Sequence, residues 1–329
     1  MPGTRRTRLL ALAACLSVAM AGALTTAGTA AAGEAPAPRA PGCDIPAQPP
    51  GDTPADTSTP QQPGTSVDRI VRSGGLDRAV RLHLPDGYTA DRAWPVVLVF
   101  HGRGNSGPTT EGFTELSALP AILAYPDGVV GGDDRLAWQG APYSAPGVDD
   151  VAFTGDLLDE LESTLCVDTK RVYATGKSNG GGFTEILACR LADRIAAFAP
   201  VAGAYYRAGE PPCEPGRAVP VLSLHGTGDT TIPYTGDAGR GLPAIPDWVA
   251  GWAERNSCAP QPATRRIEPD ITVSTWSGCD ARAQVEHVAI DGAGHTWPGA
   301  TLYSGGGSTT YTVRATDLIW EFFSKHHLR

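Results

Sequence analysis

A serine held between glycines is the most reactive pattern in this chain. The segment GKSNG at 176–180 follows an apolar run at 171–175 and precedes a stretch of helical periodicity. In that context a G-x-S-x-G pentapeptide forms a nucleophile elbow, a sharp strand-to-helix turn that holds the serine hydroxyl out over the edge of a sheet. Glycines are needed there because larger side chains would collide with the adjacent strand and helix. Ser178 is therefore a candidate nucleophile, although a glycine-rich chain can also show this pattern by chance.

A serine hydroxyl is a weak nucleophile unless a base removes its proton, and two later residues complete the set that this requires. His295 lies in the glycine-rich segment GAGHTWPG at 292–299, just after an apolar run that ends at residue 290. Asp229 follows another apolar run, at 219–224, and is suited to orient the histidine and to stabilise its protonated form. The chain order Ser178, Asp229, His295 is the order that accompanies such an elbow, so the sequence predicts acyl transfer.

Acyl transfer also requires donors for the negative charge that develops on the carbonyl oxygen. The backbone N–H of Asn179 directly follows the nucleophile and is the first predicted donor. The loop after the apolar run at 96–100 reads HGRG at 101–104, and we assign the amide of Arg103 as the second donor. His101 in the same loop is interpreted as a residue that shapes it.

Four aromatic side chains fall in loops that follow expected strands, near the position of an acyl group. Rings at such positions can sandwich a flat substrate, and packing in the core is the alternative interpretation. The predicted substrate-binding residues are Trp138, Tyr205, Tyr206 and Trp297. No His/Cys/Asp cluster has metal-ligand spacing and no glycine-rich phosphate loop is present in the sequence, so we expect neither a metal nor a cofactor.

Short apolar runs alternate with helix-like stretches along the chain. This alternation predicts a single α/β domain with a mostly parallel sheet and helices on both faces. In such a sheet, reactive residues gather beyond the carboxyl ends of the strands. The expected strands are 79–84, 96–100, 121–125, 171–175, 195–201, 219–224 and 285–290, and the expected helices are 150–165, 179–191, 246–256 and 315–325.

The amino-terminal part of the chain has the composition of an exported protein. Residues 1–32 combine arginines, an apolar run and a small-residue cleavage site, which indicates a signal peptide of the Sec or twin-arginine type. Residues 33–66 are rich in Pro, Ala and Thr and are expected to be largely flexible, so the catalytic domain is assigned to 67–329. The formal net charge of −9 disfavours nucleic acid and anionic membranes as partners. We expect a secreted, soluble monomer.

Six cysteines follow the signal peptide, an even number that favours disulfides in an exported chain, with one or two buried thiols as the alternative. Cys258 and Cys279 are close in sequence and are expected to form a local pair. A parallel sheet would place the three middle cysteines toward its amino-terminal edge, away from Ser178. Pairs between Cys189 and Cys213 and between Cys43 and Cys166 are then possible, and the full connectivity stays open.

Several longer segments make the chain similar to a known family. They are SGGLDR at 73–78, FHGRGNS at 100–106, GVDDV at 147–151, ATGKSNGGGF at 174–183, RIAAFAPV at 194–201, LPAIP at 242–246 and EFFSKH at 321–326. Through them the chain resembles the secreted feruloyl esterases of the feruloyl esterase C type and, more distantly, the polyhydroxybutyrate depolymerase-like esterases. One departure is Arg103, which stands where the depolymerase-like relatives often carry cysteine.

The resemblance implies an α/β-hydrolase fold and a Ser-His-Asp triad at Ser178, His295 and Asp229. It also implies hydrolysis of hydroxycinnamoyl esters, with feruloylated arabinoxylan or small hydroxycinnamate esters as substrates and ferulic acid as the product. An acetylxylan or short-chain hydroxyalkanoate esterase is the alternative. A non-catalytic hydrolase-fold protein that binds carbohydrate is the remote alternative, because a fold alone does not establish an activity.

Overall fold

The computed structural model describes residues 42, 43, 61–206 and 208–329 of the chain. The expected signal peptide at 1–32 and most of the Pro/Ala/Thr-rich segment at 33–66 lie outside the described residues. At the start of the longer described part, the buried side-chain amide of Gln61 donates to the carbonyl oxygen of Leu82 at 3.0 Å. Packing against the first strands therefore begins a few residues before the domain boundary that the sequence suggested.

Ten strands form one sheet in the order β1-β2-β4-β3-β7-β8-β9-β12-β11-β10. The central run from β4 to β12 is parallel, and antiparallel strands extend it at both edges. The predicted mostly parallel sheet is thus confirmed. The strands are β1 (Ser66–Ser73), β2 (Leu76–His83), β3 (Trp94–Phe100), β4 (Ile122–Pro126), β7 (Val167–Lys177), β8 (Ala197–Val201), β9 (Val221–Gly226), β10 (Ala263–Glu268), β11 (Ile271–Trp276) and β12 (Val285–Ile290), with β5 (Val129–Val130) and β6 (Leu136–Ala137) in a separate small ladder.

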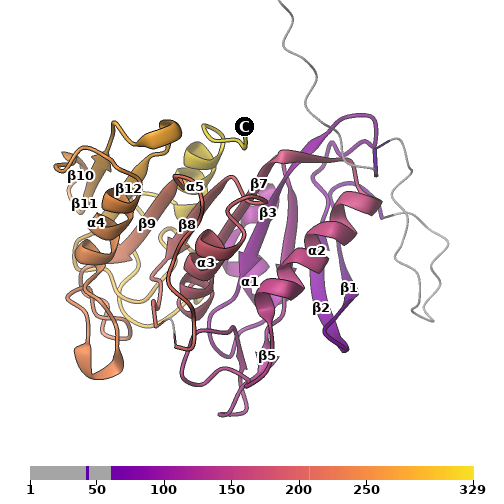
Figure 1. Cartoon of the computed structure of the whole chain (residues 1–329), viewed down its shortest axis with the longest axis horizontal. Helices are drawn as coiled ribbons and strands as arrows, with labels where there is room; N and C mark the ends of the chain where they lie inside the picture. Colours follow the sequence, from indigo (N-terminus) through magenta and orange to yellow (C-terminus); the bar gives the residue numbers. More distant parts are fainter. Residues whose placement is uncertain (1–41, 44–60, 207) are drawn as a thin grey trace, which may run out of the picture. The chain divides into compact units, whose positions relative to one another are not determined.

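Helices cover both faces of the sheet (Figure 1). They are α1 (Gly107–Thr114), α2 (Asp150–Thr164), α3 (Asn179–Arg190), α4 (Ile245–Arg255) and α5 (Ala315–Phe323), with the 3₁₀ turns η1 (Leu116–Ala118), η2 (Ala238–Arg240) and η3 (Asp280–Arg282). Side chains of α2, α3 and α4 share one apolar core with Val96 and Leu98 of β3, whereas α1 and α5 share the other with Val97 and Val99. β3 is therefore apolar throughout, since both of its faces are buried. None of the helices in the described residues is long and apolar enough to cross a membrane.

The elements that sequence patterns did not reveal lie mainly at the sheet edges. β1 and the β10–β11 hairpin are antiparallel edge strands in which polar and apolar residues are interspersed, so they carry no continuous apolar run. α1 is short and begins with Gly107 and Pro108, a composition that does not indicate a helix. These additions widen the sheet and leave the order of the central strands unchanged.

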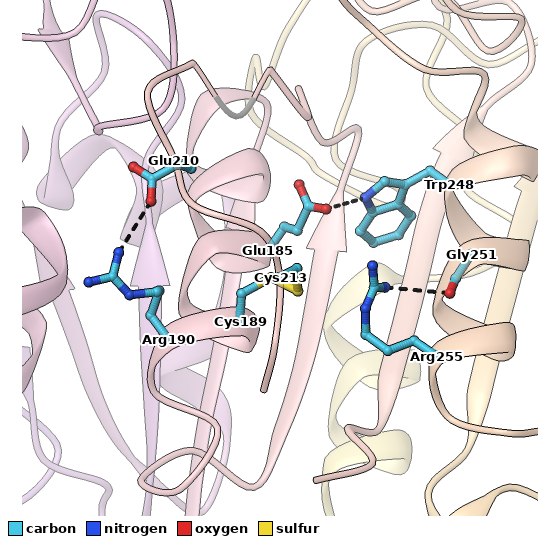
Figure 2. The surroundings of a disulfide bond; sticks show 8 residues. All are labelled: Glu185, Cys189, Arg190, Glu210, Cys213, Trp248, Gly251 and Arg255. Atoms are coloured by element: carbon cyan, nitrogen blue, oxygen red, sulfur yellow. Dashed lines mark hydrogen bonds and ion pairs between the residues drawn. A yellow bond between two sulfur atoms is a disulfide. The ribbon is translucent and has the colours of Figure 1, made fainter. Parts of the chain in front are cut away.

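Three disulfides join the six cysteines of the described chain, in the pairs Cys43–Cys166, Cys189–Cys213 and Cys258–Cys279. The second of them ties the last turn of α3 to the loop between β8 and β9, and Arg190 approaches Glu210 of that loop to 3.6 Å (Figure 2). Because α3 begins directly after Ser178, this disulfide fixes the β8–β9 loop to the helix that positions the candidate nucleophile.

Candidate active site

Ser178 occupies the turn between β7 and α3 with a backbone conformation of φ 58° and ψ −119°. A non-glycine residue rarely adopts such angles, and here the surrounding chain enforces them. A methyl group on Gly176 would lie 2.8 Å from the carbonyl oxygen of Phe100, and one on Gly180 would overlap that same oxygen. Glycine at both positions lets the elbow pack directly against β3, which leaves the half-buried Ser178 at the carboxyl edge of the sheet.

Asp229 and His295 meet because the strands before them, β9 and β12, are parallel neighbours. The Nδ1 atom of His295 lies 2.7 Å from Oδ2 of Asp229. The other carboxylate oxygen of Asp229 accepts the backbone N–H groups of Thr231 and Ile232, each at 2.8 Å. Since both carboxylate oxygens are engaged, the carboxylate is held in one orientation, with the imidazole Nε2 left to act as a base.

The loop that carries His295 also contacts the residue before the nucleophile. A methyl group on Gly305 would lie 2.9 Å from Nζ of Lys177 and would overlap the carbonyl oxygen of His295. The structure thus brings Asp229 and His295 into hydrogen-bond contact and sets their loops beside the elbow. No hydrogen bond joins the hydroxyl of Ser178 to His295 in the described residues, a bond that often tightens only when substrate binds.

The electrostatic environment keeps the two partners in different charge states. Burial lowers the pKa of His295 to about 4, against the opposing effect of its hydrogen bond to Asp229. For Asp229, burial raises the pKa, but the nearby imidazole of His225, 3.4 Å away, and the hydrogen bond from His295 outweigh it and bring the pKa well below the usual range. At neutral pH the imidazole is therefore a free base beside an ionised carboxylate, the pairing that general-base catalysis requires.

The predicted oxyanion loop lies against the nucleophile. A methyl group on Gly102 would be 3.3 Å from Cβ of Ser178. His101 shapes this loop: its Nε2 accepts the N–H of Gly128 at 2.9 Å, so Nδ1 carries the proton and donates to the carbonyl oxygen of Gly102 at 2.8 Å. In the described residues the amide of Arg103 has no hydrogen-bond acceptor, and that of Asn179, at the first position of α3, has none within the helix.

Three of the four aromatic residues predicted to bind substrate are core residues. Trp138 is fully buried, stacks on Phe183 with ring centres 5.1 Å apart, and donates from Nε1 to the carbonyl oxygen of His101. Trp297 and Tyr205 are 1% and 3% exposed, and Tyr205 stacks on Trp248 at 3.8 Å. These three rings thus have little exposed surface and make their contacts in the interior, because a loop position does not reveal whether a ring faces the cleft or the core.

Tyr206, the fourth predicted aromatic, is half-buried and belongs to a set of side chains that we call the rim row: Arg103, Tyr143, Tyr206 and Arg240. The guanidinium of Arg103 lies 4.3 Å from the ring centre of Tyr143, whose ring meets that of Tyr206 edge-on at 6.0 Å. Arg240 donates to the hydroxyl of Tyr206 at 2.7 Å. Sequence reasoning did not find Tyr143 or Arg240, since each comes from a separate loop without a motif.

Asn179 and Asp150 add a second layer of support beneath the oxyanion loop. The side-chain oxygen of Asn179 accepts the backbone N–H of Trp138 at 2.8 Å. Asp150 is buried, pairs with Arg78 at 2.8 Å and accepts the N–H of Gln139. Its neighbour Asp149 caps α2. Within the described residues, no group of three or more His, Cys, Asp or Glu side chains could hold a metal ion.

Comparisons with known proteins place the chain among esterases. No family model matches the sequence. The chain is 32% identical over 233 residues to feruloyl esterase B of Piromyces equi, across 66% of this chain and 42% of that protein. It is 32% identical over 273 residues to the putative esterase NocK of Nocardia uniformis subsp. tsuyamanensis, across 74% of this chain and 77% of that protein. The chain thus spans less than half the length of the Piromyces protein and most of NocK.

The fold recurs in a solved acetyl xylan esterase from Aspergillus awamori. The TM-score is 0.56 at 15% sequence identity, over 78% of this chain and 99% of that one. This likeness establishes the shared fold.

Proposed function

The chain belongs to the feruloyl esterase-type family of carboxylic ester hydrolases with the α/β-hydrolase fold, and we propose that it is a serine esterase that releases ferulate from hydroxycinnamoyl esters. The observation that carries this proposal is the 2.7 Å hydrogen bond between Asp229 and His295, at the same sheet edge as the strained elbow of Ser178. A base oriented by a carboxylate, beside a hydroxyl held out of the sheet, is the arrangement that acyl transfer uses.

In the first half of the proposed reaction, Oγ of Ser178 attacks the ester carbonyl and Nε2 of His295 takes its proton. Asp229 stabilises the imidazolium that forms, since its carboxylate is already hydrogen-bonded to Nδ1. The C–O bond to the alcohol then breaks, and His295 returns the proton to the leaving oxygen. The products of this step are the free alcohol and an acyl-enzyme on Ser178.

In the second half, a water molecule takes the place of the alcohol. His295 removes a proton from the water as it attacks the acyl carbonyl. The bond between the acyl carbon and Oγ of Ser178 then breaks as His295 returns the proton to Oγ, and the free acid leaves. In both halves the negative charge on the carbonyl oxygen faces the amides of Arg103 and Asn179. Each such donor contributes about a hundredfold or more in rate.

The hydroxycinnamoyl substrate is supported by the family and by the rim row. Tyr143 and Tyr206 supply rings beside the oxyanion loop, where a planar acyl group would enter. An acetylxylan esterase is the second candidate, because the burial of Trp138, Trp297 and Tyr205 leaves fewer rings to hold a flat acyl group than the sequence suggested. The solved structure with the shared fold is also named an acetyl xylan esterase.

Rates on three substrates separate these candidates. We expect kcat/KM on methyl ferulate to exceed that on acetylated xylan and on hydroxybutyrate oligomers. A preference for acetylated xylan would replace the substrate assignment while leaving the triad in place. Covalent labelling by a fluorophosphonate tests the remote alternative of a non-catalytic binding protein, which would not react.

We also propose that the protein is secreted and acts as a monomer through a catalytic domain at 67–329. Three disulfides in the described chain support an oxidising environment. The proposal predicts protein in the culture medium of the source cells, with the residues before 33 removed, and a monomer mass in light scattering.

A further inference from the structure

Lys177, the last residue of β7, carries a buried charge that the reaction as described does not use. Its side chain is 3% exposed. In the described residues the charged group that acts on its ammonium is the carboxylate of Asp229. A buried ammonium costs stability because it gives up hydration, and the attraction of Asp229 offsets only part of that cost. A residue retained at such a cost is a candidate for a functional role.

The choice of lysine at this position is itself informative. The chain has 26 lysine and arginine residues, but its lysines are only Lys170, Lys177 and Lys325. Lysine places a compact point charge on a flexible stem, whereas arginine needs room for a planar fork and its five donors. A methyl group on Gly305 would lie 2.9 Å from Nζ, so the point charge of Lys177 lies directly against the loop of His295.

The ammonium lies beside the segment that fixes the candidate base. Gly305 separates Nζ of Lys177 from the carbonyl oxygen of His295, and the next residue, Gly306, accepts the backbone N–H of His295 at 2.8 Å. The titratable groups that act on the imidazole in the described residues are Asp229, Lys177 and His225. Asp229 raises the pKa of the imidazole, whereas Lys177 and His225 lower it, so Lys177 opposes the carboxylate.

We propose that Lys177 is a positioning residue for the esterase reaction, whose buried charge keeps the imidazole of His295 free of a proton and able to accept the proton of Ser178 in acidic surroundings. The inference rests on the proposed function, because it concerns the same base. Burial lowers the pKa of Lys177 itself to about 8, so the ammonium stays charged across the acidic and neutral range. Without that charge, protonation of His295 would begin at a higher pH.

The test is the pH dependence of the rate at which a fluorophosphonate labels Ser178, since this reaction needs the same base and does not depend on the natural substrate. For Lys177→Met and Lys177→Gln we expect the acidic limb of this profile to move up by about one pH unit. Lys177→Arg keeps the charge and is expected to keep the limb of the parent protein. Lys325→Met, which removes the half-exposed lysine beyond α5, is the matched control and should leave the profile unchanged.

The melting temperature gives a second readout. If Lys177 only packed the interior, its replacement would lower the Tm, whereas the removal of a buried charge should raise it. Removing a buried charge whose desolvation Asp229 offsets only in part should raise the Tm of Lys177→Met by about 3 °C. An unmoved acidic limb in Lys177→Met, with or without a fall in Tm, would overturn the inference, as would an equal shift in Lys177→Arg. If the parent protein is not labelled at Ser178 at all, the proposed function fails instead, so the two failures are distinguishable.

Discussion

Replacing Asp229 with asparagine isolates the role of one charge with little change in shape. In the structure Oδ1 accepts two backbone N–H groups, from Thr231 and Ile232, and an asparagine oxygen can keep both. The amide nitrogen would then face Nδ1 of His295, which now lies 2.7 Å from Oδ2. Because an amide NH₂ can only donate there, the imidazole must carry its proton on Nε2, which removes the base that Ser178 needs.

The expected loss follows from this change of tautomer and from the missing negative charge. We expect kcat to fall by about ten thousandfold, which corresponds to about 5 kcal/mol in the activation free energy. The assay is single-turnover acylation by a chromogenic ester, with a thermal melt to show that the variant is folded. Asp149→Asn is the matched control, because asparagine caps a helix as well as aspartate does and Asp149 only caps α2. Asp229→Asn activity within tenfold of the parent protein would refute the proposed role of Asp229.

Three further predictions concern the fold that holds the site. Burial lowers the pKa values of four histidines to about 4, so these side chains are neutral in the folded state and bind protons more readily when the chain is unfolded. The Tm should therefore fall as the pH drops from about 6.5 toward 4. A Tm that stays constant across that pH range would contradict this. The histidines are His101, His287, His295 and His326. Gly180→Ala should abolish activity and lower the Tm, because the added methyl group overlaps the carbonyl oxygen of Phe100. Gly155→Ala, whose methyl group lies in open space on α2, should instead stabilise the folded protein by about 1 kcal/mol. Equal effects of the two substitutions in urea unfolding would contradict the steric explanation of the elbow. The Cys189–Cys213 disulfide joins residues 24 apart in sequence, and its removal should lower the stability of the fold by about 3 kcal/mol. Denaturant unfolding of the double serine variant measures this loss, and an unchanged midpoint would contradict the prediction.

Sequence reasoning went furthest where a local motif and a strand end coincide. The apolar runs before Ser178, Asp229 and His295 are central strands of a parallel sheet, so their carboxyl ends had to meet at one edge. Glycines at 176 and 180 have a steric cause that any strand next to the elbow would impose. For these features, chain order and elementary packing rules were sufficient.

Contacts between residues of distant loops could not be predicted from the sequence. Whether Trp138 faces substrate or interior depends on Phe183 and on the carbonyl of His101, which approach it only in the folded chain. The rim row likewise joins Tyr143 to Arg240 through Tyr206, from three loops with no shared pattern. The outermost strands β1, β10 and β11 were missed because polar residues interrupt them and they give no continuous apolar signal.

Release of ferulate from methyl ferulate, by the parent protein and by Ser178→Ala, tests the central claim most directly. Loss of the nucleophile in a triad costs about a millionfold in kcat. The account therefore predicts steady release by the parent protein and release at the background rate by the folded variant. Ferulate release that survives in Ser178→Ala would contradict the assignment of the nucleophile, and a parent protein that releases none would contradict the proposed substrate.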